Sequence, residues 1–298
     1  MKSFTDLLNL AKTKGKVRCV VAMAEDEAVL EGIRLGQELG IISPVLVGNS
    51  MHIKEIAKKV RLNTAGCEIH DTTGENESIL RALELVKEKG GFLMKGMLSS
   101  SVFLKGILNK ETGLRKGKIL SHIAVFQIPG YHKLLFMSDG GMNPNLNLQT
   151  RIEIIKNAID ALSHIGIKNP KIGLIAASET VNPDMGETVD AAKISELSRD
   201  GQLSGATIDG PFGFDVAISA RAAAIKKIDS PIAGDVDFIL MPSISAANIW
   251  AKGLIYFSKT TAAGMVVGAS HPIIMLSRAD DPQTKLNSIA LGVVIAQE

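Results

Sequence analysis

Apolar positions along the chain follow two alternating patterns, short β-branched runs and longer stretches with helical spacing. The runs predict strands at residues 17–23, 44–47, 67–70, 92–94, 172–176, 206–208, 238–241 and 273–276. The stretches between them predict helices at residues 29–39, 53–60, 75–89, 102–108, 147–166, 187–197, 216–225 and 246–256. Strands that alternate with helices are typical of a mostly parallel sheet covered on both faces, so we expect an α/β fold.

A predicted hairpin interrupts this alternation near the middle of the chain. Apolar runs at residues 121–128 and 134–137 bracket the turn Pro129-Gly130-Tyr131-His132. A chain of 298 residues with this many strands is expected to form two lobes, and ligands commonly bind in clefts between lobes. We therefore predict two α/β/α lobes around a cleft, the first formed by residues 1–137 and 265–298 and the second by residues 138–264.

The last predicted strand ends at a polar group that begins with Ser277 and Arg278. Asp281 and Pro282 follow, and apolar residues then recur at helical spacing, which predicts Asp281 as the N-cap of a helix. Ligands bind at this end of the strands in open α/β sheets, and a helix N-terminus suits an anion. Ser277, Arg278 and Asp280 therefore form a candidate anion site. The alternative is that they only shape a turn.

Charge and cysteine content narrow the class of protein. The chain has 33 basic and 31 acidic residues, a net charge of +2, so no overall field favours nucleic acid or a membrane surface. Cys19 and Cys67 are the only cysteines and both lie among apolar residues, which indicates a reducing compartment. The first residues lack a signal-peptide pattern, and no apolar run reaches about 18 residues. We expect a soluble, cytoplasmic protein.

Common nucleotide and metal signatures are missing from the sequence. No Gly-x-Gly-x-x-Gly follows a predicted strand and no Gly-x-x-x-x-Gly-Lys-Ser/Thr occurs, which disfavours a dinucleotide fold of the usual type and a P-loop kinase. The six histidines form no pair at helical i, i+4 spacing, and neither cysteine has a metal-ligand neighbour, so we predict no metal site. The absence of Gly-x-Ser-x-Gly argues against serine-hydrolase chemistry.

Basic and amide side chains offer further candidates for binding an anionic ligand. The densest basic segment is either a solvated loop or a cradle for a polyanion such as a coenzyme phosphate, and comprises Lys105, Lys110, Arg115, Lys116 and Lys118. Asp139 and Asn143 flank Gly140-Gly141 after a strand, where a turn explains the glycines better than it explains Asn143. Asn248 and Lys252 are four residues apart and would share one helix face, although simple exposure also explains Lys252.

Several motifs stand in a fixed order along almost the full chain: Leu114-Arg-x-Gly117, Ser121-His122, Asp139-x-x-x-Asn143, Asp209-Gly-Pro-x-x-x-Asp215, Ala233-Gly234-x-x-Asp237-x-x-Leu240-Met241-Pro242, Asn248-x-x-x-Lys252 and Ser277-Arg278-Ala279-Asp280. Each motif alone is weak, but their order and spacing are specific. Together they resemble the phosphate acetyl/butyryltransferase family, and are most similar to its butyryltransferase branch.

The resemblance implies an enzyme that transfers a short-chain acyl group between coenzyme A and inorganic phosphate. It further implies a homo-oligomer whose two lobes are similar in fold to isocitrate and isopropylmalate dehydrogenases, with coenzyme A as a substrate and no separate cofactor. The family's Ser-Arg pair falls on Ser277 and Arg278. The serine would assist the reacting carbonyl, and the arginine would hold phosphate or coenzyme A.

The chain departs from the family pattern at two places. The catalytic aspartate of the acetyltransferase branch lies seven residues past the serine, where this chain has Thr284, so we assign the base to Asp280. The family usually has Asn or His followed by Thr where this chain has Ser99-Ser100, and Arg where it has Lys105. Lysine keeps the positive charge but loses the bidentate fork. We predict catalytic roles for Ser277, Arg278 and Asp280, and substrate-binding roles for Ser100, Lys105, Arg115, Asp139, Asn143, Asn248, Lys252 and Ser270.

The expected mechanism is direct attack of the coenzyme A thiolate on acyl phosphate in a ternary complex. The alternatives are a phosphate acetyltransferase and a coenzyme A-binding regulatory protein without turnover. A third alternative is an NAD(P)- and metal-dependent decarboxylating dehydrogenase of similar fold. That enzyme would need clustered aspartates for the metal and arginines for the substrate acid, and the sequence does not assemble such a set.

Overall fold

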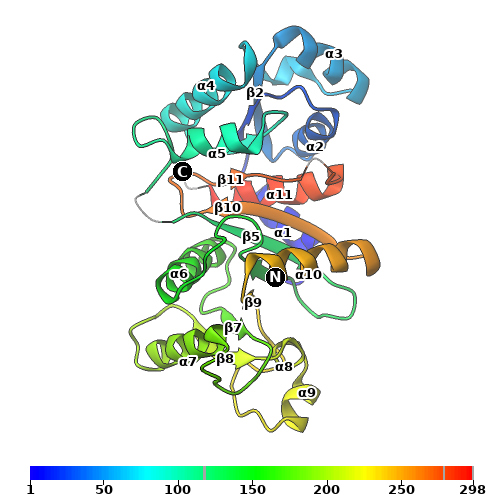
Figure 1. Ribbon diagram of the computed structural model, residues 1–298. Helices are drawn as coiled ribbons and strands as arrows, with labels where there is room; N and C mark the ends of the chain where they lie inside the picture. Colours follow the sequence, from blue (N-terminus) through cyan, green and yellow to red (C-terminus); the bar gives the residue numbers. More distant parts are fainter. Residues whose placement is uncertain (117–118, 278, 297–298) are drawn as a thin grey trace. The chain divides into compact units, whose positions relative to one another are not determined.

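The chain forms two compact units, each built from strands and helices (Figure 1). The computed structural model describes residues 1–116, 119–277 and 279–296. The central unit is drawn from Met1–Ser3 and Ile119–Ala262, and the terminal unit from Phe4–Lys118 and Ala263–Glu298. Both units are α/β structures, as the alternating pattern predicted.

The terminal unit is built from the first and last parts of the chain. Its helices are α1 (Phe4–Thr13), α2 (Glu27–Glu38), α3 (Ser50–Val60), α4 (Gly74–Lys89), α5 (Ser100–Leu108) and α11 (Pro282–Ile295), with a 3-10 turn at Thr64–Gly66. Its strands are β1 (Val17–Ala22), β2 (Ile42–Gly48), β3 (Glu68–Asp71), β4 (Phe92–Lys95), β11 (Ile273–Ile274) and β10 (Thr261–Val267), which begins at the unit boundary.

The sheet of the terminal unit has the strand order β3-β2-β1-β4-β11-β10. Neighbouring strands are parallel except for β10 and β11. The chain runs outward from β1 to β3 through α2 and α3, and returns across the sheet through α4 to β4. Because such crossovers are right-handed, α4 covers the face opposite α2 and α3. Helix α5 packs on α4, whereas α11 packs between α1 and α2 (Figure 1).

Helix α11 is a core helix rather than a surface helix. Every residue from Lys285 to Ile295 is buried, which is the environment of a helix that is apolar all round. Gly292 allows the Phe92 ring of β4 to pack directly against the α11 backbone, because a Cβ at this position would lie only 2.8 Å from the ring. The last part of the chain therefore completes a core that the first part begins.

The strands of the central unit have the order β5-β6-β9-β7-β8. Its strands are β5 (Ser121–Gln127), β6 (Leu135–Ser138), β7 (Lys171–Ile175), β8 (Thr207–Phe212) and β9 (Phe238–Leu240), and all neighbours are parallel except β5 and β6. Its helices are α6 (Leu148–His164), α7 (Gly186–Arg199), α8 (Phe214–Ile218), α9 (Ala220–Ile225) and α10 (Ile244–Phe257).

An aromatic group joins α10 and α8 to this sheet. The Trp250 ring of α10 lies edge-on to Phe126 of β5 and to Phe214 of α8, with ring centroids 5.2 and 5.3 Å apart. Both geometries are the favoured edge-to-face arrangement of aromatic rings. The contact fixes α10 over the strands from which the polar loops of this unit leave.

The structure differs from the sequence predictions at a few elements. The hairpin at β5 and β6 forms as predicted, but β6 pairs with β9, so the hairpin belongs to the central unit and that unit begins at Ile119 rather than at 138. The predicted helix at 216–225 is two helices, because Ser219 leaves the helical conformation and caps α9. The strand predicted at 273–276 is only two residues long, and α1 was not predicted.

Two negative findings concern the described residues. None of their helices combines the length and the apolar character that a membrane span requires. No cluster of three or more His, Cys, Asp or Glu side chains in the described part of the chain could hold a metal ion.

A charged group ties β1 to the edge strand β3. The Arg18 guanidinium donates to the Glu68 carboxylate at 2.9 Å, and His70 contacts the other oxygen of that carboxylate at 2.7 Å. The hydrogen bond from Arg18, with that from His70, lowers the pKa of Glu68 to about 2. Since the folded pKa lies below the ordinary value, the ionised group stabilises the fold above that value, and the stabilisation is lost as the pH falls toward 2.

We therefore expect Glu68→Gln to lower the melting temperature at pH 7, with a gap to wild type that narrows as the pH falls from 5 to 3. Thermal unfolding followed by circular dichroism across this range measures the gap. Glu88→Gln, an exposed change on α4, serves as the control and should show no such trend. A Glu68→Gln gap that is constant with pH would contradict the assignment.

Candidate active site

We call residues 275–281, which follow β11, the Ser277 loop, and hydrogen bonds join its described residues Ser277, Ala279 and Asp280. The Ser277 amide donates to the Asp280 carboxylate at 2.8 Å, and the Ala279 amide donates to the Ser277 hydroxyl oxygen at 3.3 Å. The Asp280 amide donates to the Ser277 carbonyl at 3.2 Å. These bonds fix the exposed Ser277 side chain relative to Asp280. Arg278 lies outside the described residues.

The start of α11 confirms the predicted cap. The Asp281 carboxylate accepts the Thr284 amide at 2.7 Å, and Pro282 is the first helical residue. Thr284, which stands where the family's acetyltransferase branch has its aspartate, is therefore held by its backbone in the first turn of the helix. Asp281 acts as a structural cap and leaves Asp280 as the acidic residue of the loop itself.

Ser100 leaves the sheet at the same edge as the Ser277 loop. Strands β4 and β11 are parallel, with Met94 beside Ile274, so the segments that follow them emerge together. The Ser99 amide and hydroxyl donate to the Glu75 carboxylate at 2.8 and 2.9 Å, and Ser99 is the N-cap of α5. Ser99 thus has a structural role, and Ser100 begins the helix with its side chain exposed.

Arg115 and Ser270 lie together but before β11 instead of after it. The Ser270 amide donates to the Leu114 carbonyl at 2.8 Å, and Arg115 forms a bridge with Ala269. Because the Ser277 loop follows β11, this pair belongs to the opposite edge of the sheet. Lys105 lies in the last turn of α5, which runs back toward that edge, and both Lys105 and Arg115 are exposed.

His271, next to Ser270, is half-buried in the turn before β11. The Ser270 hydroxyl lies 3.1 Å from Nδ1 of His271. Burial and then the nearby Lys116 ammonium lower the pKa of His271, because both disfavour an imidazolium. The ring is therefore neutral at pH 7, and it adds no positive charge to the segment that holds Arg115.

Asp139 and Asn143 form one hydrogen-bonded unit at the end of β6. The fully buried Asp139 carboxylate accepts the Gly141 and Met142 amides, both at 2.9 Å, and the Asn143 side-chain amide at 2.5 Å. The same Asn143 nitrogen donates to the Leu120 carbonyl at 2.8 Å. Buried carboxylates require such partners, so Asp139 organises the loop that the sequence placed after this strand.

Helix α10 brings Asn248 to this loop. The Asn248 side-chain amide donates to the Gly140 carbonyl at 3.4 Å. Lys252 is exposed one turn further along the helix. The structure therefore brings Asp139, Asn143 and Asn248 together in the central unit, with Lys252 next to them along α10.

Arg151 of α6 is a buried charge that the sequence analysis missed. Its guanidinium donates to Asp190 at 3.1 Å and to the Pro242 carbonyl at 2.9 Å. Pro242 follows β9 and precedes Ser243, the N-cap of α10. Arg151 thus fixes the segment that sets the start of α10. The only signal in the sequence is a charged residue on a helix that is otherwise apolar at that face.

Two buried lysines in the terminal unit were also missed. Lys95, the last residue of β4, is 7% exposed and donates to the Gly96 carbonyl at 3.2 Å, while Lys285 of α11 is 3% exposed and donates to the Asp280 carbonyl. Lysine is almost never this buried. Lys95 ends β4, and Lys285 lies in the first turns of α11, where its ammonium group contacts the backbone of the Ser277 loop.

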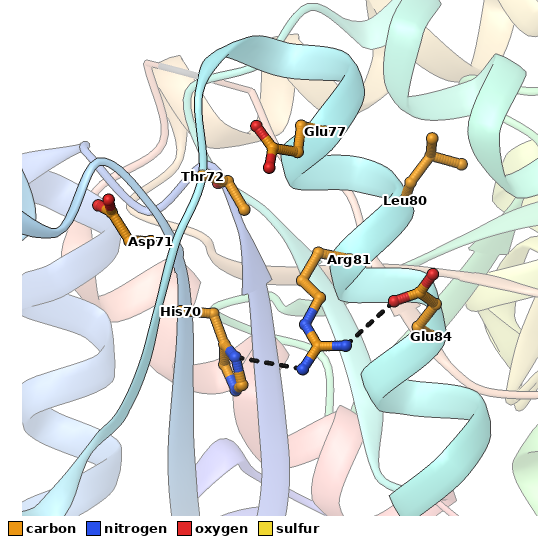
Figure 2. A pocket seen from close by; sticks show the side chains of 7 residues that line it. All are labelled: His70, Asp71, Thr72, Glu77, Leu80, Arg81 and Glu84. Carbon is orange, nitrogen blue, oxygen red and sulfur yellow. Dashed lines mark hydrogen bonds and ion pairs between the residues drawn. The ribbon is translucent and has the colours of Figure 1, made fainter.

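A pocket of about 360 Å³ lies elsewhere, between β3 and α4 (Figure 2). Its charged side chains are occupied with one another and with the backbone. Arg81 donates to Glu84 at 3.1 Å and contacts His70 at 3.5 Å, while hydrogen bonds from Ser50 and from Thr73 lower the pKa values of Asp71 and Glu77. The pocket contains none of the predicted site residues, and β2 and β1 separate β3 from β4.

Comparisons with known proteins agree with these motifs. The family described as phosphate acetyl/butaryl transferase matches residues 3–95 and 75–293. The phosphate butyryltransferase of Clostridium beijerinckii is 42% identical over 296 residues, covering 99% of this chain and 98% of that protein. The probable phosphate butyryltransferase of Bacillus subtilis is 38% identical, covering 98% of each.

The fold has a similar solved counterpart. The crystal structure of a branched-chain phosphotransacylase from Enterococcus faecalis V583 superposes with a TM-score of 0.83 at 26% identity, covering 94% of this chain and 100% of the other. The sequence likeness extends over the strand-to-helix connections that carry Ser277, Asp139 and Asn248. This chain therefore belongs to the phosphate acetyl/butyryltransferase family.

Proposed function

We propose that this protein transfers a short-chain acyl group between coenzyme A and inorganic phosphate. The observation that supports this most strongly is the near-full-length likeness to phosphate butyryltransferases. The Ser277 loop, with Asp280 within it and the buried Lys285 ammonium group bound to its backbone, is consistent with a site for anionic substrates.

The proposed mechanism is direct attack of the coenzyme A thiolate on the acyl carbon of acyl phosphate. Acyl phosphate is already activated, so the enzyme needs to orient two anions and to ionise a thiol. A thiol with a pKa of roughly 8.5 costs about 2 kcal/mol to ionise at pH 7. The larger contribution comes from holding the thiolate in attack geometry and from placing positive charge at the departing phosphate.

Within the Ser277 loop we assign three roles. Arg278 neutralises the phosphate that leaves, and the Ser277 hydroxyl donates to the reacting carbonyl oxygen. Asp280 takes the thiol proton through the carboxylate oxygen that does not accept the Ser277 amide. The Asp280 carboxylate can both orient Ser277 and accept the thiol proton, because one of its oxygens accepts the Ser277 amide while the other remains an acceptor.

The remaining candidates would contact the parts of the substrates that do not react. Asn248 and Lys252 supply amide and ammonium donors around the Asp139 loop of the central unit, whereas the Asn143 amide nitrogen already donates to Asp139 and Leu120, so Asn143 offers its side-chain oxygen. Lys105, Arg115, Ser100 and Ser270 supply positive charge and hydroxyl groups on the terminal unit. These donors suit coenzyme A phosphates, which are recognised by charge-assisted hydrogen bonds.

The central test is acyl transfer by the purified protein. Wild type should form acyl phosphate from butyryl-coenzyme A and phosphate, and Arg278→Gln should lose about 10²- to 10³-fold in kcat, since a charge on the transition state is removed. Ser277→Ala should lose a comparable or smaller factor. Release of free coenzyme A measures the rate.

Arg61→Gln, a change of the same type at an exposed residue after α3, is the matched control and should retain full activity. An Arg278→Gln enzyme with wild-type rates would contradict the role of Arg278. A wild-type protein without transfer would contradict the proposed function.

Asp280→Asn separates the two roles of the carboxylate. Asparagine keeps an oxygen for the Ser277 amide and removes the basic oxygen, so we expect kcat to fall about 10²- to 10⁴-fold with loss of the acidic limb of the pH–rate profile. An unchanged profile with a near-wild-type rate would leave Asp280 only its place in the loop. Thermal unfolding of the variant should match wild type.

The acyl preference follows from the relatives and can be measured directly. We expect butyryl- and isobutyryl-coenzyme A to give higher kcat/KM values than acetyl-coenzyme A. Initial rates over acetyl-, butyryl-, isobutyryl- and isovaleryl-coenzyme A at saturating phosphate provide the comparison. A higher value for acetyl-coenzyme A would assign the protein to the acetyltransferase branch of its family.

A further inference from the structure

Lys285 is an ionisable residue in the core of the terminal unit. Only 3% of it is exposed, and it belongs to the part of α11 that is buried on every side. Placing an ammonium group in such surroundings is unfavourable unless it has a partner. Lys285 carries the only charge among residues 285–295, so its presence there needs a reason other than packing.

The ammonium group of Lys285 is directed at the backbone of the Ser277 loop. Its Nζ donates to the Asp280 carbonyl, and no acidic side chain among residues 1–116, 119–277 and 279–296 pairs with it. The ammonium group of Lys285 is therefore bonded to a neutral oxygen of the loop, the Asp280 carbonyl, in place of a carboxylate. Hydrogen bonds from charged donors are stronger than neutral ones, so this contact is a firm attachment point.

The contact continues through the loop to Ser277. Lys285 holds the Asp280 backbone, and the Asp280 carboxylate holds the Ser277 amide at 2.8 Å. The Ser277 hydroxyl oxygen in turn accepts the Ala279 amide at 3.3 Å. A displacement at Lys285 is thereby transmitted to the residue that faces the substrate in the proposed reaction.

The space for Lys285 is provided by a glycine on α2. A Cβ at Gly32 would lie 2.9 Å from Cβ of Lys285 and 3.8 Å from the Pro282 carbonyl oxygen. One turn further along α2, a Cβ at Gly36 would lie 2.9 Å from Ile42 and 3.4 Å from Ile289. Both glycines allow α2 to pack closely on α11, but only Gly32 faces Lys285.

We propose that Lys285 is a positioning residue for acyl transfer, which holds the Ser277 loop in its reactive arrangement from within the core. The inference rests on the proposed function for its catalytic consequence. Its structural part, the hold on the loop, stands independently. Lys285 is too buried to contact the substrates, so it acts through Asp280 and Ser277.

The first test replaces Lys285 by Met and by Arg. Methionine has a similar volume and no charge, and exchanging a buried charge for an apolar side chain is often neutral or stabilising for the fold. We therefore expect the melting temperature of Lys285→Met to stay level or rise, while kcat falls about 10- to 100-fold because the loop is misplaced. The KM for coenzyme A should change less than twofold, and Lys285→Arg should recover part of kcat.

The second test compares Gly32→Ala with Gly36→Ala. Gly32→Ala crowds Lys285 of α11, with a closest contact of 2.9 Å, whereas Gly36→Ala crowds Ile42 of β2 at 2.9 Å and Ile289 of α11 at 3.4 Å, so both should lower the melting temperature. Only Gly32→Ala displaces Lys285, and only this variant should show the selective fall in kcat. Equal losses of kcat in the two variants would overturn the inference, because α2–α11 packing alone would then explain them.

The third test does not depend on activity. Amide hydrogen exchange of residues 275–281, read by mass spectrometry, should be faster in Lys285→Met and in Gly32→Ala than in wild type and in Gly36→Ala. Unaltered exchange in Lys285→Met, or an unaltered kcat, overturns the inference. If wild type transfers no acyl group, the proposed function fails, and the exchange comparison still decides whether Lys285 holds the loop.

Discussion

The parallel pairing of β11 with β4 is the constraint on which the candidate site depends. Strand β11 has two residues, yet its register with Leu93 and Met94 places the Ser277 loop beside the start of α5. The pairing of β4 and β11 brings the segments of Ser100 and Ser277 to one edge of the sheet, although these residues are more than 170 positions apart in sequence. The same pairing sends Arg115 and Ser270 to the other edge, and thereby divides the basic and hydroxyl side chains of this unit into two groups.

Buried charge is used in a similar way in both units. Asp139 accepts three donors inside the central unit, and Arg151 attaches α6 to the segment before α10. Lys285 attaches α11 to the Ser277 loop in the terminal unit. In each case a buried ionised group binds backbone atoms of a loop that leaves a strand. Such groups cost solvation free energy, and what they provide is one defined loop conformation.

Much of the fold could be predicted from the sequence because its signals are local. Apolar periodicity indicated most strands and helices, and the Asp281–Pro282 pair indicated the start of α11. The boundary at Ile119 could not be predicted, since it depends on the pairing of β6 with β9, which are distant in sequence. Asp139 and Asn143 could be singled out because they flank two glycines after a strand, but neither their hydrogen bond nor the burial of Lys285 could be predicted. Helical spacing alone suggests one buried face, whereas α11 is buried on all faces from Lys285 onward.

The interleaved order of the two units also bears on how the chain matures during synthesis. Residues 119–262 of the central unit leave the ribosome before β11 and α11 do. The central unit can therefore begin to fold while β4 still lacks its neighbour and Phe92 still lacks the cover of α11. Domains generally fold as they are made, and incomplete cores expose apolar surface. The terminal unit thus passes through an unfinished stage with exposed apolar surface until α11 has been synthesised, and the Ser277 loop is the last part of the site to take shape.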